Sequence, residues 1–169
     1  MFLNRSISNI STEVFRLNNR LLMTCDVLLA DLGLSSARLQ VLGVMASALI
    51  PQPVAQIARE LGLSRQAVQR LANELERDGV VRFGVNPRHQ QAKLVLFTAN
   101  GRMRYGFAVQ RLEPLAAKLG LDLTVSQVKA ATAVLRAIRH RIERGDVRDR
   151  MRGTGRRIRE TNAKDPPKI

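Results

Sequence analysis

The chain has 169 residues, 45% of them hydrophobic, so it is long and apolar enough to bury the core of one domain or two small ones. Its 28 Lys and Arg residues exceed the 14 acidic residues and leave a formal charge of +14, which favours a polyanionic partner over solvated surface arginines. The chain shows no apolar run near the roughly 18 residues of a membrane span, no signal-peptide core and only one cysteine, so we expect a cytoplasmic protein without a membrane partner.

The first sixty residues predict three helices. The first runs from about residue 8 to residue 32 and ends at Gly33. Its apolar positions are Leu17, Leu21, Cys25, Leu28 and Leu32. The second runs from about residue 36 to residue 49, until Pro51 and Pro53 mark a turn or a fresh helix start. A third, short helix follows in "PVAQIARELGLS", closed by Gly62, with Leu63 expected under the turn.

A fourth helix begins immediately after this corner. Ser64 is placed to cap it, and about three residues separate it from the helix before, which is the sequence form of a helix-turn-helix. Its apolar stripe consists of Val68, Leu71, Ala72 and Leu75. The opposite face carries Arg65, Gln66, Gln69, Arg70 and Asn73. Arg and Gln are good helix formers and often cover solvated faces, but Arg can make two hydrogen bonds to guanine and Gln two to adenine. Together with the tight turn before it, the wing that follows and the basic charge, this face favours a helix that enters the DNA major groove over a solvated face.

After Gly79 the apolar period changes from that of a helix to that of a strand. "VVRFGV" and "KLVLFT" predict two short strands joined by the basic loop "NPRHQQA", which together form a hairpin, or wing. Thr98 then caps a predicted helix over residues 99–119. We expect its buried positions to be Met103, Phe107, Leu112, Leu115 and Leu119.

The segment "TVSQ", residues 124–127, predicts a capping box at the start of a last helix. That helix has an apolar seam at Val128, Ala131, Leu135, Ile138 and Ile142. The seam could pack on the first helix of the same chain, but two long apolar terminal helices favour a homodimer, with Leu17 and Leu21 contributing from the first helix. The basic segment of residues 145–169 is expected to be disordered.

The order of these elements resembles the MarR family of winged-helix transcription regulators. The resemblance runs from Leu34 to Gly101 through "LSSARLQVLGVM", "VAQIARELGLSRQAVQRLANELERDGVV" and "LVLFTANG". It implies a mainly α fold with a small β-hairpin wing, in which a winged helix-turn-helix is joined to long terminal dimerisation helices. The implied division is a dimerisation helix at 1–33, a DNA-binding lobe at 34–98, helices that complete the dimerisation region at 99–144, and a tail at 145–169.

A homodimer would place two recognition helices in successive major grooves of a near-palindromic operator. Ser64 and the backbone N–H groups at the helix start would hold a phosphate. The resemblance further implies a repressor that a small aromatic effector releases by binding in a cleft between the dimerisation helices and the DNA-binding lobe. Family wings carry an acid-braced arginine, whereas here His89, Gln90 and Gln91 occupy those positions, so Arg88 or Lys93 would have to supply the wing's positive charge.

Two other functions stay open. A non-specific architectural protein would coat DNA or RNA through charge alone, and a redox sensor would use Cys25, although the apolar face around that residue favours a place in the core. The two histidines, His89 and His140, are far apart and form no metal-ligand cluster. With no phosphate-binding glycine loop, nucleophile elbow or H-E-x-x-H helix, we expect neither an enzyme nor a cofactor.

Overall fold

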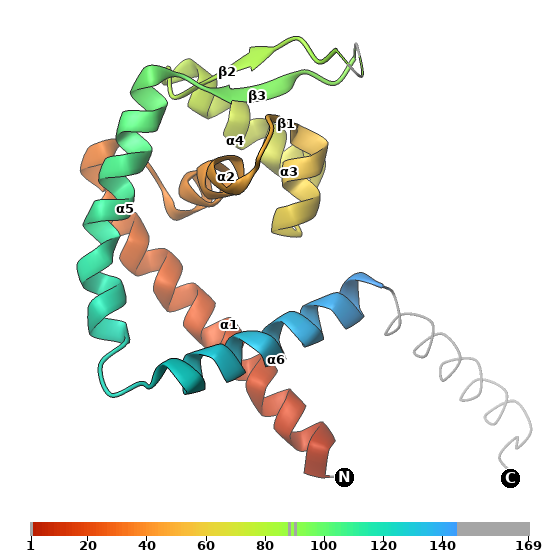
Figure 1. The fold of residues 1–169 in the computed structure, drawn as a ribbon, viewed down its shortest axis with the longest axis vertical. Coiled ribbons are helices and arrows are strands. Elements are labelled where there is room, and N and C mark those ends of the chain that lie inside the picture. The colour runs from red at the N-terminus through yellow and green to blue at the C-terminus, as the bar shows by residue number, and fades with distance from the viewer. Residues whose placement is uncertain (1, 88, 90, 145–169) are drawn as a thin grey trace, which may run out of the picture. The chain divides into compact units, whose positions relative to one another are not determined.

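The computed structural model describes residues 2–87, 89 and 91–144 (Figure 1). The predicted disordered tail and the wing residues Arg88 and Gln90 lie outside this part of the chain. The chain forms two compact units, one of residues 1–119 and one that begins at Gly120. The predicted fold class, mainly helical with a small β-hairpin wing, is confirmed.

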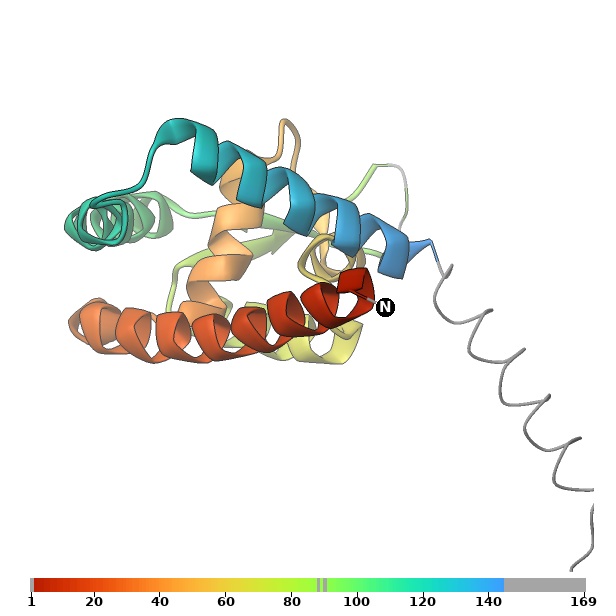
Figure 2. The same ribbon diagram turned by 90° about the horizontal axis from the view of Figure 1, so that it is seen from below.

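The first helix, α1, spans Phe2–Leu29 and is one unbroken rod (Figure 1 and Figure 2). It begins six residues before the predicted start at residue 8, in a segment rich in Ser, Thr and Asn. The hydroxyl groups there remain compatible with a helix because they donate to carbonyl oxygens one turn back, as Ser11 does to Ile7 at 2.9 Å. A 3₁₀ turn, η1, at Ala30–Leu32 follows, and Gly33 ends it in the left-handed conformation at φ 63°, as predicted.

Helix α2 spans Ser36–Ser47 and is held at its start from two sides. The side chain of Ser35 accepts from the N–H of Arg38, and Asp26 of α1 accepts from the N–H of Ser36 at 2.6 Å. The helix ends two residues before the predicted position 49. Pro53 then serves as the N-cap of helix α3, Val54–Leu61, so of the two alternatives for the prolines the fresh helix start is confirmed.

The predicted hairpin is present and belongs to a three-stranded antiparallel sheet of order β1-β3-β2. Strands β2, Val81–Gly84, and β3, Leu94–Phe97, pair in a register that joins Val81 to Phe97. Strand β1, Gln52–Pro53, adds a third strand at the other edge of β3. The sequence analysis did not predict β1, because two residues are too few to show an alternating period.

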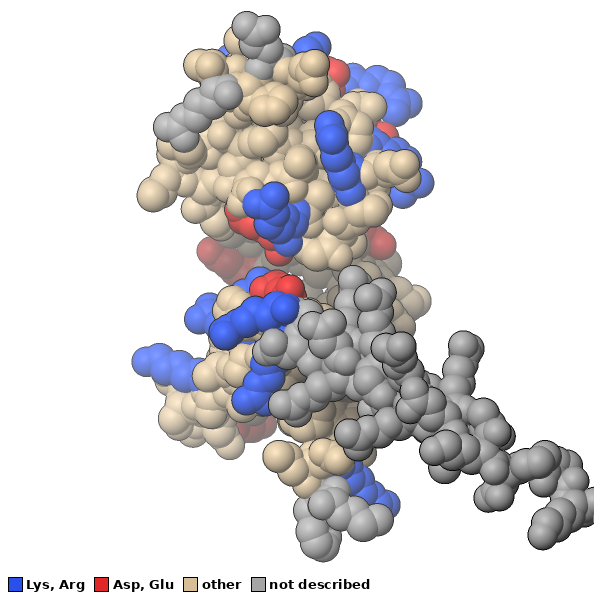
Figure 3. Space-filling model, turned by 90° about the vertical axis from the view of Figure 1, so that its right-hand side faces the viewer, with Lys and Arg blue, Asp and Glu red and all other residues tan. Residues whose placement is uncertain are grey.

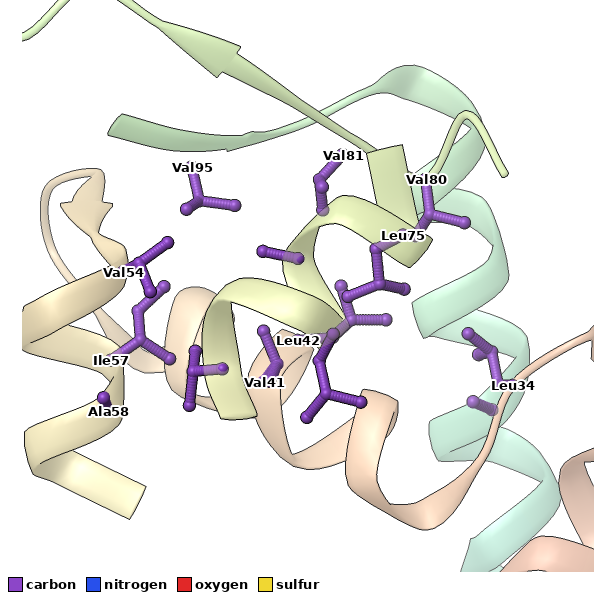
Figure 4. Close-up of a cluster of buried hydrophobic side chains, with 14 of the residues drawn as sticks. Leu34, Val41, Leu42, Val54, Ile57, Ala58, Leu75, Val80, Val81 and Val95 are labelled. Atoms are coloured by element: carbon purple, nitrogen blue, oxygen red, sulfur yellow. The ribbon is translucent and has the colours of Figure 1, made fainter. Parts of the chain in front are cut away.

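One apolar core joins these elements, and α4, Arg65–Arg77, lies at its centre. Leu42 of α2, Ile57 of α3, Leu75 of α4 and Val95 of β3 are all fully or almost fully buried, and Figure 4 shows them pointing toward one another. Each such side chain contributes roughly 1.5 to 3 kcal/mol by leaving water. The core therefore fixes one face of α4 and leaves its other face outward.

Helix α5 spans Ala99–Leu119 and begins as predicted, with Thr98 Oγ1 accepting from the N–H of Gly101 at 2.9 Å. Its predicted buried face is wrong at three of the five positions, because Met103, Phe107 and Leu119 are 55%, 51% and 52% exposed. Leu112 and Leu115 are half-buried. The face toward the core instead carries small side chains, Gly101 and Ala108, which let the helix approach the winged-helix elements closely.

Helix α6, Val125–Glu143, lies in the second unit, and its capping box is confirmed. The N–H of Thr124 donates to Gln127 Oε1 at 2.8 Å, and the N–H of Gln127 donates to Thr124 Oγ1 at 3.3 Å. Along the predicted seam Leu135 and Ile142 are 43% and 61% exposed, whereas Ile138 is half-buried. Within its own unit, most of this apolar seam is therefore uncovered.

No individual helix among the described residues has both the length and the apolar character of a membrane span. Residues 3–32 and α2 meet those limits only when taken together, with a bend of 83° between them, and they do so by length and composition alone.

Candidate nucleic-acid interface

The turn between α3 and α4 fixes the direction of α4. Gly62 is left-handed at φ 68°, and its N–H donates to Ala58 and Arg59, while the N–H of Leu63 also donates to Ala58 at 3.0 Å. Ser64 then caps α4 by accepting from the N–H of Ala67 at 3.1 Å. The prediction that Leu63 is tucked under the turn is wrong: its backbone closes the turn, but its side chain is 43% exposed.

Helix α4 has the two faces that the sequence predicted. Val68, Leu71, Ala72 and Leu75 are buried in the core. On the opposite face Arg65, Gln66, Arg70 and Asn73 are exposed and Gln69 is half-buried. These five side chains, together with Glu74 and Arg77, line one open groove along the helix. The apolar stripe therefore holds the predicted polar set on one outward surface, which we call the recognition face.

The carboxylates next to the recognition face are engaged in the structure. Glu74 Oε2 accepts from Arg38 Nη2 at 3.1 Å, and Glu76 Oε1 accepts from the N–H of Phe83 at 3.3 Å. The ion pairs among the described residues include neither Arg65 nor Arg70. The guanidinium groups of the recognition face are therefore available to an anionic ligand.

The second arm of the wing comes close to the recognition face. Gln91 and Lys93 line a groove of about 360 Å³ together with Arg65, Gln69 and Asn73. The predicted wing residues and the predicted helix residues thus share one surface, although about twenty residues of sequence separate the wing from the helix. His89 is exposed but does not line this groove, and the structural positions of Arg88 and Gln90 are not described.

An asparagine holds the base of the wing together. Asn86 Nδ2 donates to the carbonyl oxygen of Ala92 at 2.9 Å, across the loop that joins β2 and β3. Within the loop, backbone bonds from His89 to Asn86 and from Ala92 to His89, each 3.1 Å, complete the turn. A neutral amide therefore braces the base of this wing.

Three residues of this region were not predicted from the sequence. Arg77 lines the recognition face seven positions after Arg70, and helical spacing could have placed it there. Arg38 contacts α4 from α2, and Asn86 braces the wing. Periodicity gives no signal for these last two, because the partners of Arg38 lie on another helix and Asn86 lies in a loop.

The basic charge is dispersed over the surface shown in Figure 3. Lys and Arg side chains on that face are separated by uncharged surface, and acidic side chains lie beside several of them. Charge alone therefore does not define a continuous polyanion-binding band on this face.

Cys25 was the other candidate site, and the two histidines were not expected to form a metal site. Cys25 is half-buried against the core, and this burial, followed by the nearby Asp26 carboxylate, raises the pKa of its thiol. His140 Nδ1 lies 3.2 Å from Glu143 Oε2 on α6. Within the described part of the chain, no group of three or more His, Cys, Asp or Glu side chains could hold a metal ion.

Comparison with known proteins gives the same fold. The sequence model of the MarR family matches residues 32–92. An uncharacterized protein of Mycobacterium tuberculosis is 38% identical over 96 residues, which are 57% of this chain. The chain spans 66% of the length of that relative.

Two solved structures illustrate the structural likeness. A mutant MarR from E. coli complexed with operator DNA superposes with a TM-score of 0.69 at 20% identity, over 79% of this chain and 95% of that one. CouR from Rhodococcus jostii RHA1, bound to p-coumaroyl-CoA, gives a TM-score of 0.70 at 22% identity, over 76% of this chain and 90% of that one. At these identities the likeness is one of fold.

Proposed function

Because the chain belongs to the MarR family, whose members are transcriptional regulators and not enzymes, we propose that it is a homodimeric, sequence-specific DNA-binding regulator that acts as a repressor. In this proposal residues 34–98 form the DNA-binding lobe, and residues 1–33 and 99–144 form the dimerisation region. The protein would work in the cytoplasm on a near-palindromic operator.

The recognition face carries this proposal. It presents two arginines, two glutamines and an asparagine on a helix whose other side is locked into the core. A major groove about 12 Å wide admits a helix, and these side chains match the donors and acceptors of base edges. The exposed Ser64 and the free N–H groups at the start of α4 would hold a phosphate, and Gln91 and Lys93 would contact DNA beside the helix.

Dimerisation is supported by apolar surface that each of the two compact units leaves uncovered by itself. On α1 Val14 and Leu17 are 40% and 54% exposed, and on α6 Val128 is 48% exposed. Single exposed apolar residues are common, but long stripes on two terminal helices favour burial against another helix. A second copy of the chain would supply that helix and would set the recognition helices roughly 34 to 36 Å apart.

A cavity of about 520 Å³ is the candidate effector site. It lies between the end of α2, strand β3 and the start of α5, and it has both apolar and cationic walls. The walls include Met45, Leu49, Ile50, Phe97, Tyr105, Arg82 and Arg102. Gln52 also lines the cavity, and its buried Oε1 has no hydrogen-bond partner among the described residues. The CouR structure is bound to p-coumaroyl-CoA, and we propose a small aromatic acid for the cavity in this chain.

The test of the function is a footprint on the DNA upstream of the protein's own gene, combined with selection from random DNA. We expect one protected, near-palindromic site and an affinity at least about a thousandfold above that for random DNA at physiological salt. A ratio near one would instead support the architectural protein that binds DNA or RNA through charge. Release of the protected site by aromatic acids, and loss of that release in Arg102→Ala, would test the effector cavity.

A further inference from the structure

Two amides at the centre of the recognition face are bonded to each other. Gln69 Nε2 donates to Asn73 Oδ1 at 2.8 Å. The two residues are four positions apart, which places their side chains one above the other on the same side of α4. They line both the groove along the helix and the groove beside the wing, so they stand on the ridge between the two. Any duplex that enters these grooves meets this pair.

The bond fixes which atoms the pair offers to a ligand. Each amide has one acceptor oxygen and two N–H donors. The bond uses one N–H of the Gln69 nitrogen and the Asn73 oxygen. The Gln69 oxygen therefore remains as an acceptor beside the second N–H of its nitrogen, and the Asn73 nitrogen keeps both of its N–H donors. Among the described residues, the side chains of Gln69 and Asn73 make no hydrogen bond other than this one.

The two purine bases differ in how they match this pattern. In the major groove adenine offers a donor at N6 and an acceptor at N7, whereas guanine offers two acceptors, O6 and N7. The Gln69 oxygen can accept from adenine N6 while the Asn73 nitrogen donates to adenine N7. Guanine would place its O6 against the Gln69 oxygen, and two acceptors facing each other repel.

Flanking residues provide the opposite preference. Arg65 precedes Gln69 by one turn in the same row, and Arg70 lies beside it on the recognition face. An arginine has donors only, so it pairs with the two acceptors of guanine. The helix therefore presents a donor-and-acceptor pair between two sets of pure donors.

We propose that the bonded Gln69–Asn73 pair reads an adenine in each operator half-site, between guanines that Arg65 and Arg70 contact. This inference rests on the proposed function, because it assumes that α4 enters the major groove. It assigns base specificity to two residues acting as one unit.

The experiment uses the full-length protein and the half-site obtained by selection from random DNA. In that duplex each adenine is replaced in turn by 7-deazaadenine, which lacks the N7 acceptor but still pairs with thymine. We expect one adenine at which the replacement weakens binding of the unmodified protein about tenfold. Asn73→Ala should bind the unmodified duplex more weakly and should no longer respond to that replacement.

Gln66→Ala is the matched control, because Gln66 is an exposed amide on the same face without a bond to Asn73. It should keep the full response to 7-deazaadenine. Alanine is a good helix former at these solvent-facing positions, and thermal unfolding of each variant verifies that the fold is retained.

The outcomes separate the two levels of the proposal. Selection that yields no preferred sequence would overturn the proposed function itself. A preferred sequence without a sensitive adenine, or with an adenine whose sensitivity survives in Asn73→Ala and Gln69→Ala, would overturn the assignment to this pair and leave sequence-specific binding intact.

Discussion

Arg38 Nη1 donates to Asp78 Oδ2 at 2.8 Å, although 40 residues separate the two in the sequence. The same guanidinium contacts Glu74 at 3.1 Å and the carbonyl oxygen of Gly33 at 3.0 Å. One side chain thus ties α2 and the end of η1 to the C-terminal half of α4. Since only 22% of the Arg38 side chain is exposed, these bonds are partly shielded from water.

Removal of this contact should therefore loosen the recognition helix. We expect Arg38→Ala to lower the free energy of unfolding by about 1 kcal/mol, measured by urea denaturation. Arg16→Ala is the control, because Arg16 pairs with Glu13 through side chains that are 69% and 70% exposed. That change should stay within about 0.5 kcal/mol, and equal losses in the two variants would show that the Arg38 contacts contribute nothing special.

A glycine in the first turn of α5 should be intolerant of any side chain. A Cβ built at Gly101 would overlap the backbone carbonyl oxygen of Val80, which cannot move without disturbing β2. Gly101→Ala should cost about 2 kcal/mol or more in thermal or urea unfolding. Gly106→Ala, in the same helix, meets no atom within 4 Å and should be neutral or stabilising by up to about 1 kcal/mol. Similar effects from both changes would contradict this account.

Arg70 should contribute to sequence recognition more than to general DNA affinity. We expect Arg70→Ala to weaken binding to the selected operator about tenfold or more, and binding to random DNA only slightly, in titrations at fixed salt. Lys118→Ala removes the same charge from the last turn of α5 and should leave the ratio of the two affinities unchanged. An equal loss on both DNAs from Arg70→Ala would mean that Arg70 contacts phosphate.

The thiol of Cys25 should be unreactive at neutral pH. Burial, and then the Asp26 carboxylate, raise its pKa, so the thiolate forms only at a pH above the range of an ordinary cysteine. The rate of alkylation at pH 7 should be several-fold lower than that of a free cysteine and should rise at higher pH. Rapid alkylation, together with peroxide-induced DNA release that Cys25→Ser abolishes, would instead establish the redox sensor.

The apolar seam of α6 should control the oligomeric state. Leu135→Glu places a charge in the seam and should convert a dimer into single chains, as measured by light scattering on a sizing column. Arg136→Glu is a neighbouring change outside the seam and should leave the dimer intact. If Leu135→Glu remained fully dimeric, the seam would not be part of the interface.

Much of this molecule follows from local sequence. The alternation of apolar and polar residues in α4, the stop signals at Gly33 and Gly62, and the capping box at Thr124 are properties of a few neighbouring residues. Each was therefore predictable, and each is present. The recognition face follows from the same periodicity, because burial of one side of a helix determines which residues point outward.

Contacts between segments that are distant in the sequence could be identified only from the tertiary structure. Several features depend on which elements pack together. They are the third strand, the exposure of Met103 and Phe107 in α5, the contacts of Arg38 with α4, and the groove that Lys93 and Gln69 line together. A local pattern shows that a helix has an apolar side, but it does not show how much of that side a neighbour covers. The sequence by itself determined the helices and their outward chemistry, whereas packing decided which residues share one surface.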